Sequence, residues 1–168
     1  ALGAHIALVG RKPEKLISVS NEIQNDGGSS SFYCCDIREE EIVKETITSI
    51  IHDQGVIHGL VNNAGGQFPV PLSMLNKQGW QAVLDTNLTG GFLMARETFT
   101  QSMSHHGGTI VNIIADMWGG MPMMGHSGAA RAGMDNFTKT AAVEWACAGV
   151  RVNAIAPGWI ASSGMNTY

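Results

Sequence analysis

Short apolar segments alternate along the chain with longer segments in which apolar residues recur at helical spacing, and this alternation constrains the fold more than any other feature. Strands are expected at residues 5–9, 30–35, 59–61, 109–114 and 150–155, and helices at about 13–24, 39–52, 79–103 and 127–148. Continuous apolar strands between amphipathic helices are typical of a parallel sheet with helices on both faces. The pattern therefore predicts an α/β protein with a doubly wound parallel sheet.

The composition fits one domain with a hydrophobic core, because 44% of the 168 residues are apolar and 14% are charged. A formal net charge of −4 argues against a nucleic-acid partner. No apolar run is long enough to cross a bilayer, so no membrane partner is expected. The six His and three Cys lack metal-ligand spacing, and no metal site is expected.

In such folds ligands bind beyond the carboxyl ends of the strands. Gly10 and Arg11 end the first strand, where an acidic residue commonly holds ribose hydroxyls and an Arg accommodates a 2′-phosphate. The planar guanidinium of Arg11 suits a phosphate, and the alternative is a solvated basic pair with Lys12 ahead of a helix. Asp36 follows the second strand. Its carboxylate can accept a hydrogen bond from an adenine amino group, or it can cap the helix that follows.

Two further segments carry small and polar residues in unusual places. Asn62–Gly66 follows an apolar strand, so a cofactor can lie against its backbone and its Asn amides can tie neighbouring strands together. A simple turn would explain the glycines but not the paired asparagines. Asn87 and Gly90-Gly91 fall inside an otherwise helical pattern, where such residues are unfavourable. They indicate close packing or a functional distortion, the alternative being a break in the helix.

Four motifs, in this order and spacing, resemble the short-chain dehydrogenase/reductase family: Asn62-Asn63-Ala64-Gly65, Asn87, Ile110-Val111-Asn112-Ile113 and Val152-Asn153-Ala154-Ile155-Ala156-Pro157-Gly158. The resemblance implies a Rossmann-like fold and runs from its second strand to just past the sixth. Residues 1–168 are then a partial single domain, truncated at both ends, without the first strand with its Gly-rich loop and without the C-terminal strand. Within the family, residues 65–68, 86–90, 126–133 and 144–147 resemble the trans-2-enoyl-CoA reductases of peroxisomes.

This resemblance implies an oxidoreductase that uses NADPH to reduce the 2,3 double bond of a trans-2-enoyl-CoA, in fatty-acid metabolism. The residues that it places at the cofactor are Gly10, Arg11, Asp36, Asn63, Ala64, Gly65, Arg131, Pro157, Gly158, Ile160 and Ser162. Those that it places at the reacting atoms are Asn87, His126, Ser127 and Arg131. It implies a cytoplasmic location for a bacterial protein and a peroxisomal one for a eukaryotic protein.

The resemblance also implies a homo-oligomer, namely a homotetramer, in which the two long helices pair across symmetric interfaces. Several apolar residues on these helices exceed what one sheet face needs: Phe92, Phe99, Phe137 and Trp145.

The catalytic Ser, Tyr and Lys of the family are replaced here by Ala115, Ser127 and Arg131. A ketone reductase needs the Tyr to protonate the carbonyl oxygen as hydride arrives. Reduction of an enoyl thioester instead puts negative charge on the thioester oxygen and takes its proton at the α-carbon. Ser127, a ribose hydroxyl of the cofactor and the cation of Arg131 can supply the oxyanion site. His126 is a candidate proton donor, or a helix-start residue that points away, and the residues single out no one donor.

Two readings from different classes remain open. The first is an active NADPH-dependent enoyl-CoA reductase, with 2,4-dienoyl-CoA reductase as the near neighbour and a carbonyl reductase next. Dienoyl-CoA reductases also lack the Tyr but generally retain the Lys, which this chain replaces with Arg131. The second is a catalytically inactive protein that binds nucleotide or an oligomeric partner. Loss of Ser, Tyr and Lys together favours it.

Overall fold

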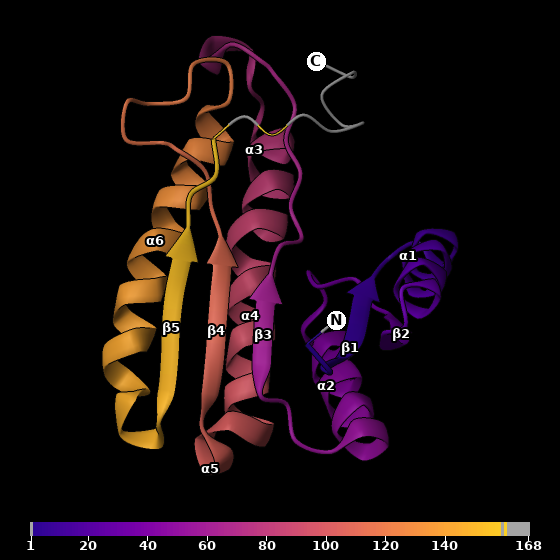
Figure 1. Cartoon of the computed structure of the whole chain (residues 1–168). Coiled ribbons are helices and arrows are strands. Elements are labelled where there is room, and N and C mark those ends of the chain that lie inside the picture. Colours follow the sequence, from indigo (N-terminus) through magenta and orange to yellow (C-terminus); the bar gives the residue numbers. More distant parts are fainter. Residues whose placement is uncertain (1, 159, 161–168) are drawn as a thin grey trace.

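The computed structural model describes residues 2–158 and 160, in which parallel strands alternate with helices as expected (Figure 1). The elements next to the strands are β1 His5–Gly10, α1 Pro13–Asn25, β2 Ser29–Cys34, α2 Glu40–Gln54, β3 Gly59–Asn62, β4 Gly108–Ile113, α6 Gly125–Glu144 and β5 Val150–Ile155. Pro13 opens α1, where its fixed φ and missing N–H suit the first helical turn. The α/β prediction is confirmed, and element boundaries lie within a few residues of those expected.

The strands form two parallel sheets. β1 pairs with β2, and β4 lies between β3 and β5, with Asn62 opposite Asn112 and Asn112 opposite Ala154. Parallel neighbours need a crossover connection, which α1, a helical run over residues 77–106 and α6 provide. The arrows of β1, β3, β4 and β5 point the same way (Figure 1), so their carboxyl ends share one end of the molecule.

α2 packs between the β1–β2 sheet and α4 (Gly90–Thr98). Its buried Val43 and Ile47 form a core cluster with Leu93 and Met94 of α4. A second core cluster lies where α6 covers β4 and β5, and its buried members are Ala95, Met103, Ile110, Ala141, Val150 and Val152. The first cluster packs the β1–β2 sheet against α2 and α4, and the second packs β4 and β5 against α6. This packing fixes the positions of the strand ends.

The helix expected over residues 79–103 is a longer run with two wide turns. α3 (Lys77–Leu84) passes into a π-helical turn, Asp85–Thr89, then α4, a second π-helical turn, Phe99–Met103, and the short α5, Ser104–His106. The glycines predicted to reflect close packing do so. A Cβ at Gly90 would lie 2.6 Å from Cγ1 of Ile37, and one at Gly91 would lie 2.5 Å from Cε of Met134.

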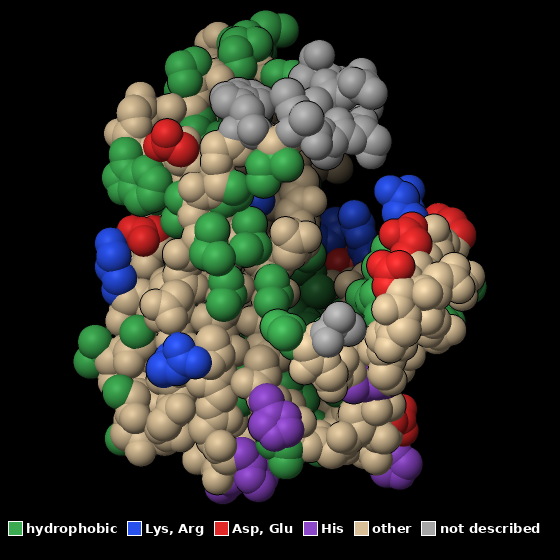
Figure 2. Space-filling model, viewed as in Figure 1, with side chains coloured by type: hydrophobic (Ala, Val, Ile, Leu, Met, Phe, Trp, Pro, Cys, Tyr) green, Lys and Arg blue, Asp and Glu red, His purple; other side chains and the backbone are tan. Residues whose placement is uncertain are grey.

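The β3–β5 sheet is covered on one face in the described part of the chain. Residues alternate between buried and more exposed along β5, and the helices lie behind the sheet in Figure 1. On the other face Val61 and Ile155 are 64% and 54% exposed, and Figure 2 shows apolar side chains over these strands. The doubly wound α/β class expected from the sequence is confirmed, and on the β3–β5 sheet the described helices that pack, α4 and α6, lie on one side. Separately, no described helix is long and apolar enough to cross a membrane.

Candidate functional site

The ends of β1, β2 and β3 border a pocket of about 150 Å³. Its walls are Val9, Gly10, Arg11, Cys35, Asp36, Ile37, Arg38, Ala64, Gly65 and Thr86. Figure 2 shows the surface hollowed between the two sheets, with Lys or Arg side chains inside the hollow. Five of the residues predicted to bind the cofactor therefore lie together: Gly10, Arg11, Asp36, Ala64 and Gly65.

Asp36 is held by two arginines at this pocket. Nε and Nη2 of Arg38 donate to its two carboxylate oxygens, the first at 2.9 Å, and Nη1 of Arg11 lies 3.9 Å from Oδ2. The hydrogen bond from Arg38 is the main reason why the pKa of Asp36 falls from its usual value of 3.8 to about 2. Arg38 was not predicted as a site residue from the sequence. Its position, two residues after an Asp at a strand end, could have indicated a role at the pocket.

Asp36 does not cap α2. That helix begins at Glu40, its N-cap is Glu39, and no side chain caps it. Oδ1 of Asp36 instead accepts from the backbone N–H of Arg38 at 3.2 Å, in a local turn. The capping alternative is wrong because the chain makes this extra turn before the helix starts.

Gly65 lets a guanidinium approach the backbone. A Cβ at this position would lie 2.6 Å from Nη2 of Arg131 and 3.0 Å from Oδ1 of Asn87. Asn87 accepts from the N–H of Gly66 at 2.8 Å and donates to its carbonyl at 2.9 Å. The buried Asn87 lies in the π-helical turn, so the mid-helix distortion serves to clamp the loop after β3.

Arg131 is largely buried on α6, and burial lowers the pKa of its guanidinium. Nη1 donates to the carbonyl of Ile113, at the end of β4, at 2.7 Å, while the buried Nε has no hydrogen-bond partner in the part of the chain that the structure describes. Among the described residues, no carboxylate lies within ion-pair distance of this group. A buried cation without a counter-ion favours an anionic or hydroxyl-rich ligand.

Ser127 and His126 are both fully buried at the start of α6. The Ser127 hydroxyl donates to Oε1 of Gln67 at 2.6 Å. Nδ1 of His126 accepts from the N–H of Ser127 at 2.9 Å. The His126 ring packs edge-on against Phe68 with centroids 4.7 Å apart, and its Nε2 has no hydrogen-bond partner within residues 2–158 and 160. His126 therefore points inward, not away from the protein.

The four predicted catalytic residues thus meet along one short segment, Gly65–Phe68: Asn87 and Arg131 at its start, Ser127 and His126 at its end. Gln67 and Phe68 carry these contacts and were not singled out as site residues. Gln67 lies 60 positions from Ser127, so no local spacing could have indicated the pair.

The paired asparagines have different roles. Nδ2 of Asn62 donates to Oδ1 of Asn112 on β4 at 2.9 Å, which confirms the predicted tie between strands. Nδ2 of Asn112 donates in turn to Thr138 of α6 at 2.8 Å. Asn63 turns the backbone, its N–H donating to the carbonyl of Val61 at 3.1 Å.

The remaining predicted cofactor residues follow β5. Pro157 is half-buried, and Gly158 and Ile160 are exposed. The structure gives them no contact with the pocket at Arg11 and Asp36. Ser162 lies outside the described residues.

The short chain dehydrogenase family model matches residues 1–168. A probable 2,4-dienoyl-CoA reductase of Bacillus subtilis is 36% identical over 169 residues, covering 97% of this chain and 65% of that protein. The solved citronellol catabolism dehydrogenase AtuB of Pseudomonas aeruginosa PAO1 is 65% identical, with a TM-score of 0.93, covering 96% of this chain and 66% of that one.

Two more distant solved structures carry a nicotinamide cofactor. A gluconate 5-dehydrogenase from Burkholderia cenocepacia in complex with NADP and tartrate is 27% identical, with a TM-score of 0.87, covering 95% of this chain and 63% of that one. An NAD+-bound xylitol dehydrogenase is 31% identical, with a TM-score of 0.91, covering 96% and 63%.

The chain belongs to the short-chain dehydrogenase family. It spans about two thirds of the length of the relatives named here, between 63% and 66%. The parallel α/β fold and the family resemblance expected from the sequence are both confirmed.

Proposed function

We propose that the full-length protein reduces the 2,3 double bond of an acyl-CoA with NADPH. The observation that carries this proposal is the set of groups at the family's catalytic positions: Ala115, a buried Ser127 and the half-buried cation of Arg131, which has no carboxylate partner among the described residues. None of these three side chains is a phenol, which could protonate a carbonyl oxygen. Together they offer a hydroxyl and a positive charge, which suit a developing enolate.

The described residues fit a nicotinamide dinucleotide. At Gly65 the lack of a side chain leaves room for Arg131, which a Cβ would displace, and the Nε–H of Arg131 has no partner among the described residues. The bound nicotinamide would supply hydride to the β-carbon of the substrate. Arg131 would hold ribose hydroxyls and attract the thioester oxygen as it gains negative charge.

Ser127 is the second group proposed at that oxygen. Its single hydroxyl proton is directed to Gln67, which fixes the orientation of the hydroxyl. A thioester oxygen at this position would compete with Gln67 for the proton, and its advantage grows as charge develops in the transition state. His126 is the candidate proton donor, and its buried Nε2 has no hydrogen-bond partner among the described residues.

Preference for NADPH is proposed from the charges at the pocket of about 150 Å³ that Gly10, Arg11 and Asp36 line, called the adenosine pocket from here on. Arg11 and Arg38 both face Asp36, so two guanidiniums meet one carboxylate at the place where a 2′-phosphate would lie. Arg11 is more than half exposed and free to turn toward a phosphate.

A second candidate substrate class is favoured by the 65% identity to the citronellol catabolism dehydrogenase. On that reading the substrate carries a branched acyclic chain, either as an alcohol or as an acyl-CoA. The family's Tyr position holds Ser127, which is a poor base for taking a proton from an alcohol, and this favours the acyl-CoA form. The relative named as a probable 2,4-dienoyl-CoA reductase also acts on a conjugated thioester, so it supports the same reaction chemistry.

The test is NADPH oxidation by the full-length protein with a trans-2-enoyl-CoA, a 2,4-dienoyl-CoA and a 3-ketoacyl-CoA, and NADP+ reduction with citronellol. Turnover of an enoyl- or dienoyl-CoA without turnover of the ketone supports the proposal. Efficient ketone reduction or citronellol oxidation contradicts it. Tight NADPH binding with no turnover of any substrate would favour the catalytically inactive binding protein.

A further inference from the structure

A larger pocket of about 400 Å³ lies between the segment after β3 and the first turns of α3. Its apolar walls are Phe68, Val70, Met74, Leu75, Gly79 and Ala82. Asn76 and Gln78 are the polar residues of the lining, and none of the described lining residues is charged. No residue of this pocket has a role in the proposed reaction.

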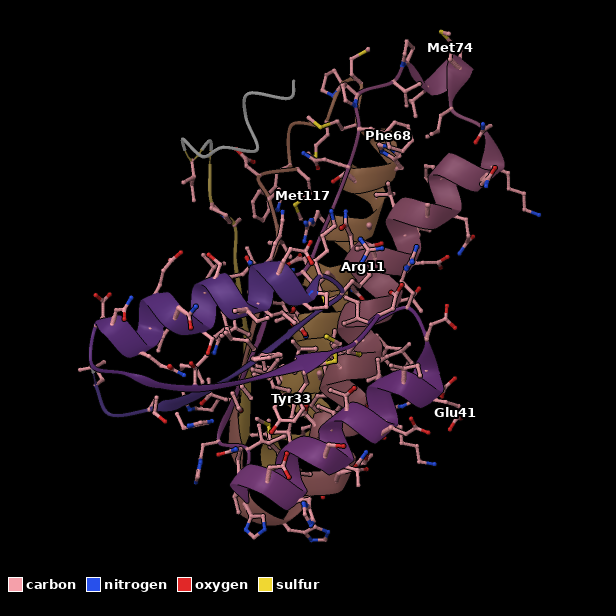
Figure 3. The ribbon with its side chains drawn as sticks, turned by 90° about the vertical axis from the view of Figure 1, so that its right-hand side faces the viewer. Arg11, Tyr33, Glu41, Phe68, Met74 and Met117 are labelled. Carbon is pink, nitrogen blue, oxygen red and sulfur yellow. The ribbon has the colours of Figure 1, made fainter. Side chains whose placement is uncertain are left out.

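Phe68 separates this pocket from the candidate reaction site. On one side its ring packs against His126, and its chain neighbour Gln67 accepts the hydrogen bond from Ser127. On the other side its Cζ lies so close to α3 that a Cβ at Gly79 would be 2.8 Å away. Figure 3 shows Phe68 between α3 and the start of α6, and Met74 farther out on the same segment.

The walls are fixed at both ends. The N–H of Val70 donates to the carbonyl of Met123 at 2.7 Å, which ties the segment to the residues before α6. Asn76 caps α3 by accepting from the N–H of Gly79 at 2.8 Å. These two hydrogen bonds hold the pocket walls in place, and small-molecule sites are usually largely preformed.

We propose that this pocket receives the apolar tail of the substrate while its thioester lies at Ser127 and Arg131. The inference rests on the proposed function and adds to it a binding site for the acyl chain of the substrate. The proposal rests on a shared wall, because Gln67 accepts the hydrogen bond of Ser127 and its chain neighbour Phe68 lines this pocket, so the two sites adjoin across one short segment. An uncharged lining with a flexible Met74 suits an apolar chain of variable shape.

Ala82 offers the way to test it, because its side chain lines the pocket and is not buried in the core. Ala82→Phe fills the pocket from α3, and Ala82→Leu fills it in part. Gln81→Phe is the matched control, since Gln81 is exposed on the same helix and does not line the pocket. None of these substitutions touches Ser127, Arg131 or the adenosine pocket.

The measurement is calorimetric binding of butanoyl-, hexanoyl-, octanoyl- and decanoyl-CoA to the full-length protein. For the wild type and Gln81→Phe, affinity should rise with each added methylene, by up to about fourfold for one that is fully buried. Ala82→Phe should bind butanoyl-CoA as the wild type does and lose the increments for the longer chains, with Ala82→Leu between the two.

Equal increments in the wild type and in Ala82→Phe would overturn the tail site and leave the proposed reaction standing, provided that enoyl-CoA turnover persists. Absence of binding for every acyl-CoA would overturn both the tail site and the proposed reaction.

Discussion

The guanidinium of Arg131 lies against the backbone of Gly65, so closely that a Cβ at position 65 would stand 2.6 Å from Nη2. The same Cβ would stand 3.0 Å from Oδ1 of Asn87, which clamps the next residue, Gly66. Because Gly65 has no side chain, Arg131 of α6 and Asn87 of the π-helical turn both reach the loop after β3 at this point.

Gly65→Ala should displace Arg131 and weaken nicotinamide-nucleotide binding by about tenfold or more, since a misplaced buried cation loses charge-assisted hydrogen bonds. Gly66→Ala is the control, because a Cβ there meets nothing within 4 Å. Fluorescence titration with NADPH measures both variants of the full-length protein. If the two bind NADPH equally well, Arg131 does not depend on the open backbone at Gly65.

Arg11→Ala and Arg38→Ala should each weaken the binding of NADPH far more than the binding of NADH. The expected loss of NADPH affinity is about tenfold, for one charge-assisted contact with the 2′-phosphate. Arg38→Ala has a second consequence, since Asp36 loses its bidentate partner and its charge is left facing the phosphate. Competition by 2′-AMP and 5′-AMP separates the 2′-phosphate from the rest of the nucleotide. Equal weakening of NADPH and NADH in both variants would contradict the assignment.

Ser127→Ala should lower enoyl-CoA turnover by about a hundredfold or more, the usual cost of removing one oxyanion donor, and leave NADPH affinity nearly unchanged. Arg131→Ala should damage both turnover and NADPH binding, because Arg131 would hold ribose as well as charge. Steady-state kinetics with direct NADPH titration distinguishes the two patterns. Full activity of Ser127→Ala would move the oxyanion site elsewhere, with His126 as the next residue to replace.

Acid should weaken the Asp36–Arg38 pair in a defined pH window. The pKa of Asp36 is about 2 in the folded protein and near 3.8 when it is unpaired, so its contribution to stability is present above about pH 4 and is lost as pH falls toward 2. Because Asp36 is partly solvated, this contribution is on the order of 1 kcal/mol. Urea unfolding at pH 5 and pH 3 should show a smaller pH effect in Asp36→Asn than in the wild type, and equal effects would contradict the pairing.

The full-length protein should be a homo-oligomer at micromolar concentration. The aromatic residues expected at the interface already pack on one another inside the chain, with Phe99 and Trp145 stacked at 4.4 Å and Phe92 and Phe137 edge to face at 5.8 Å. Val143, which is 80% exposed on α6, is the better marker of an apolar interface. Light scattering should show a multimer that Val143→Glu weakens, and a wild-type monomer would contradict the prediction.

Much of the fold follows from local pattern. Apolar strands such as residues 109–114 and amphipathic helices such as 39–52 are set by side-chain periodicity, which is a property of neighbours in the sequence. Parallel strands then force ligand-binding residues to one edge of the sheet, so Gly10, Arg11, Asp36 and Gly65 could be assigned to one pocket before any contact was known.

The tertiary structure decided which side chains meet across long sequence separations. The sequence indicated that Asn87 was unusual within its helix, but only the fold shows that it clamps Gly66 from a π-helical turn. The Ser127 hydroxyl is directed to Gln67, 60 positions away, and His126 is turned inward against Phe68. Hydrogen-bond partners and burial depend on how helices and loops pack in space, and spacing along a single chain carries no information about that packing.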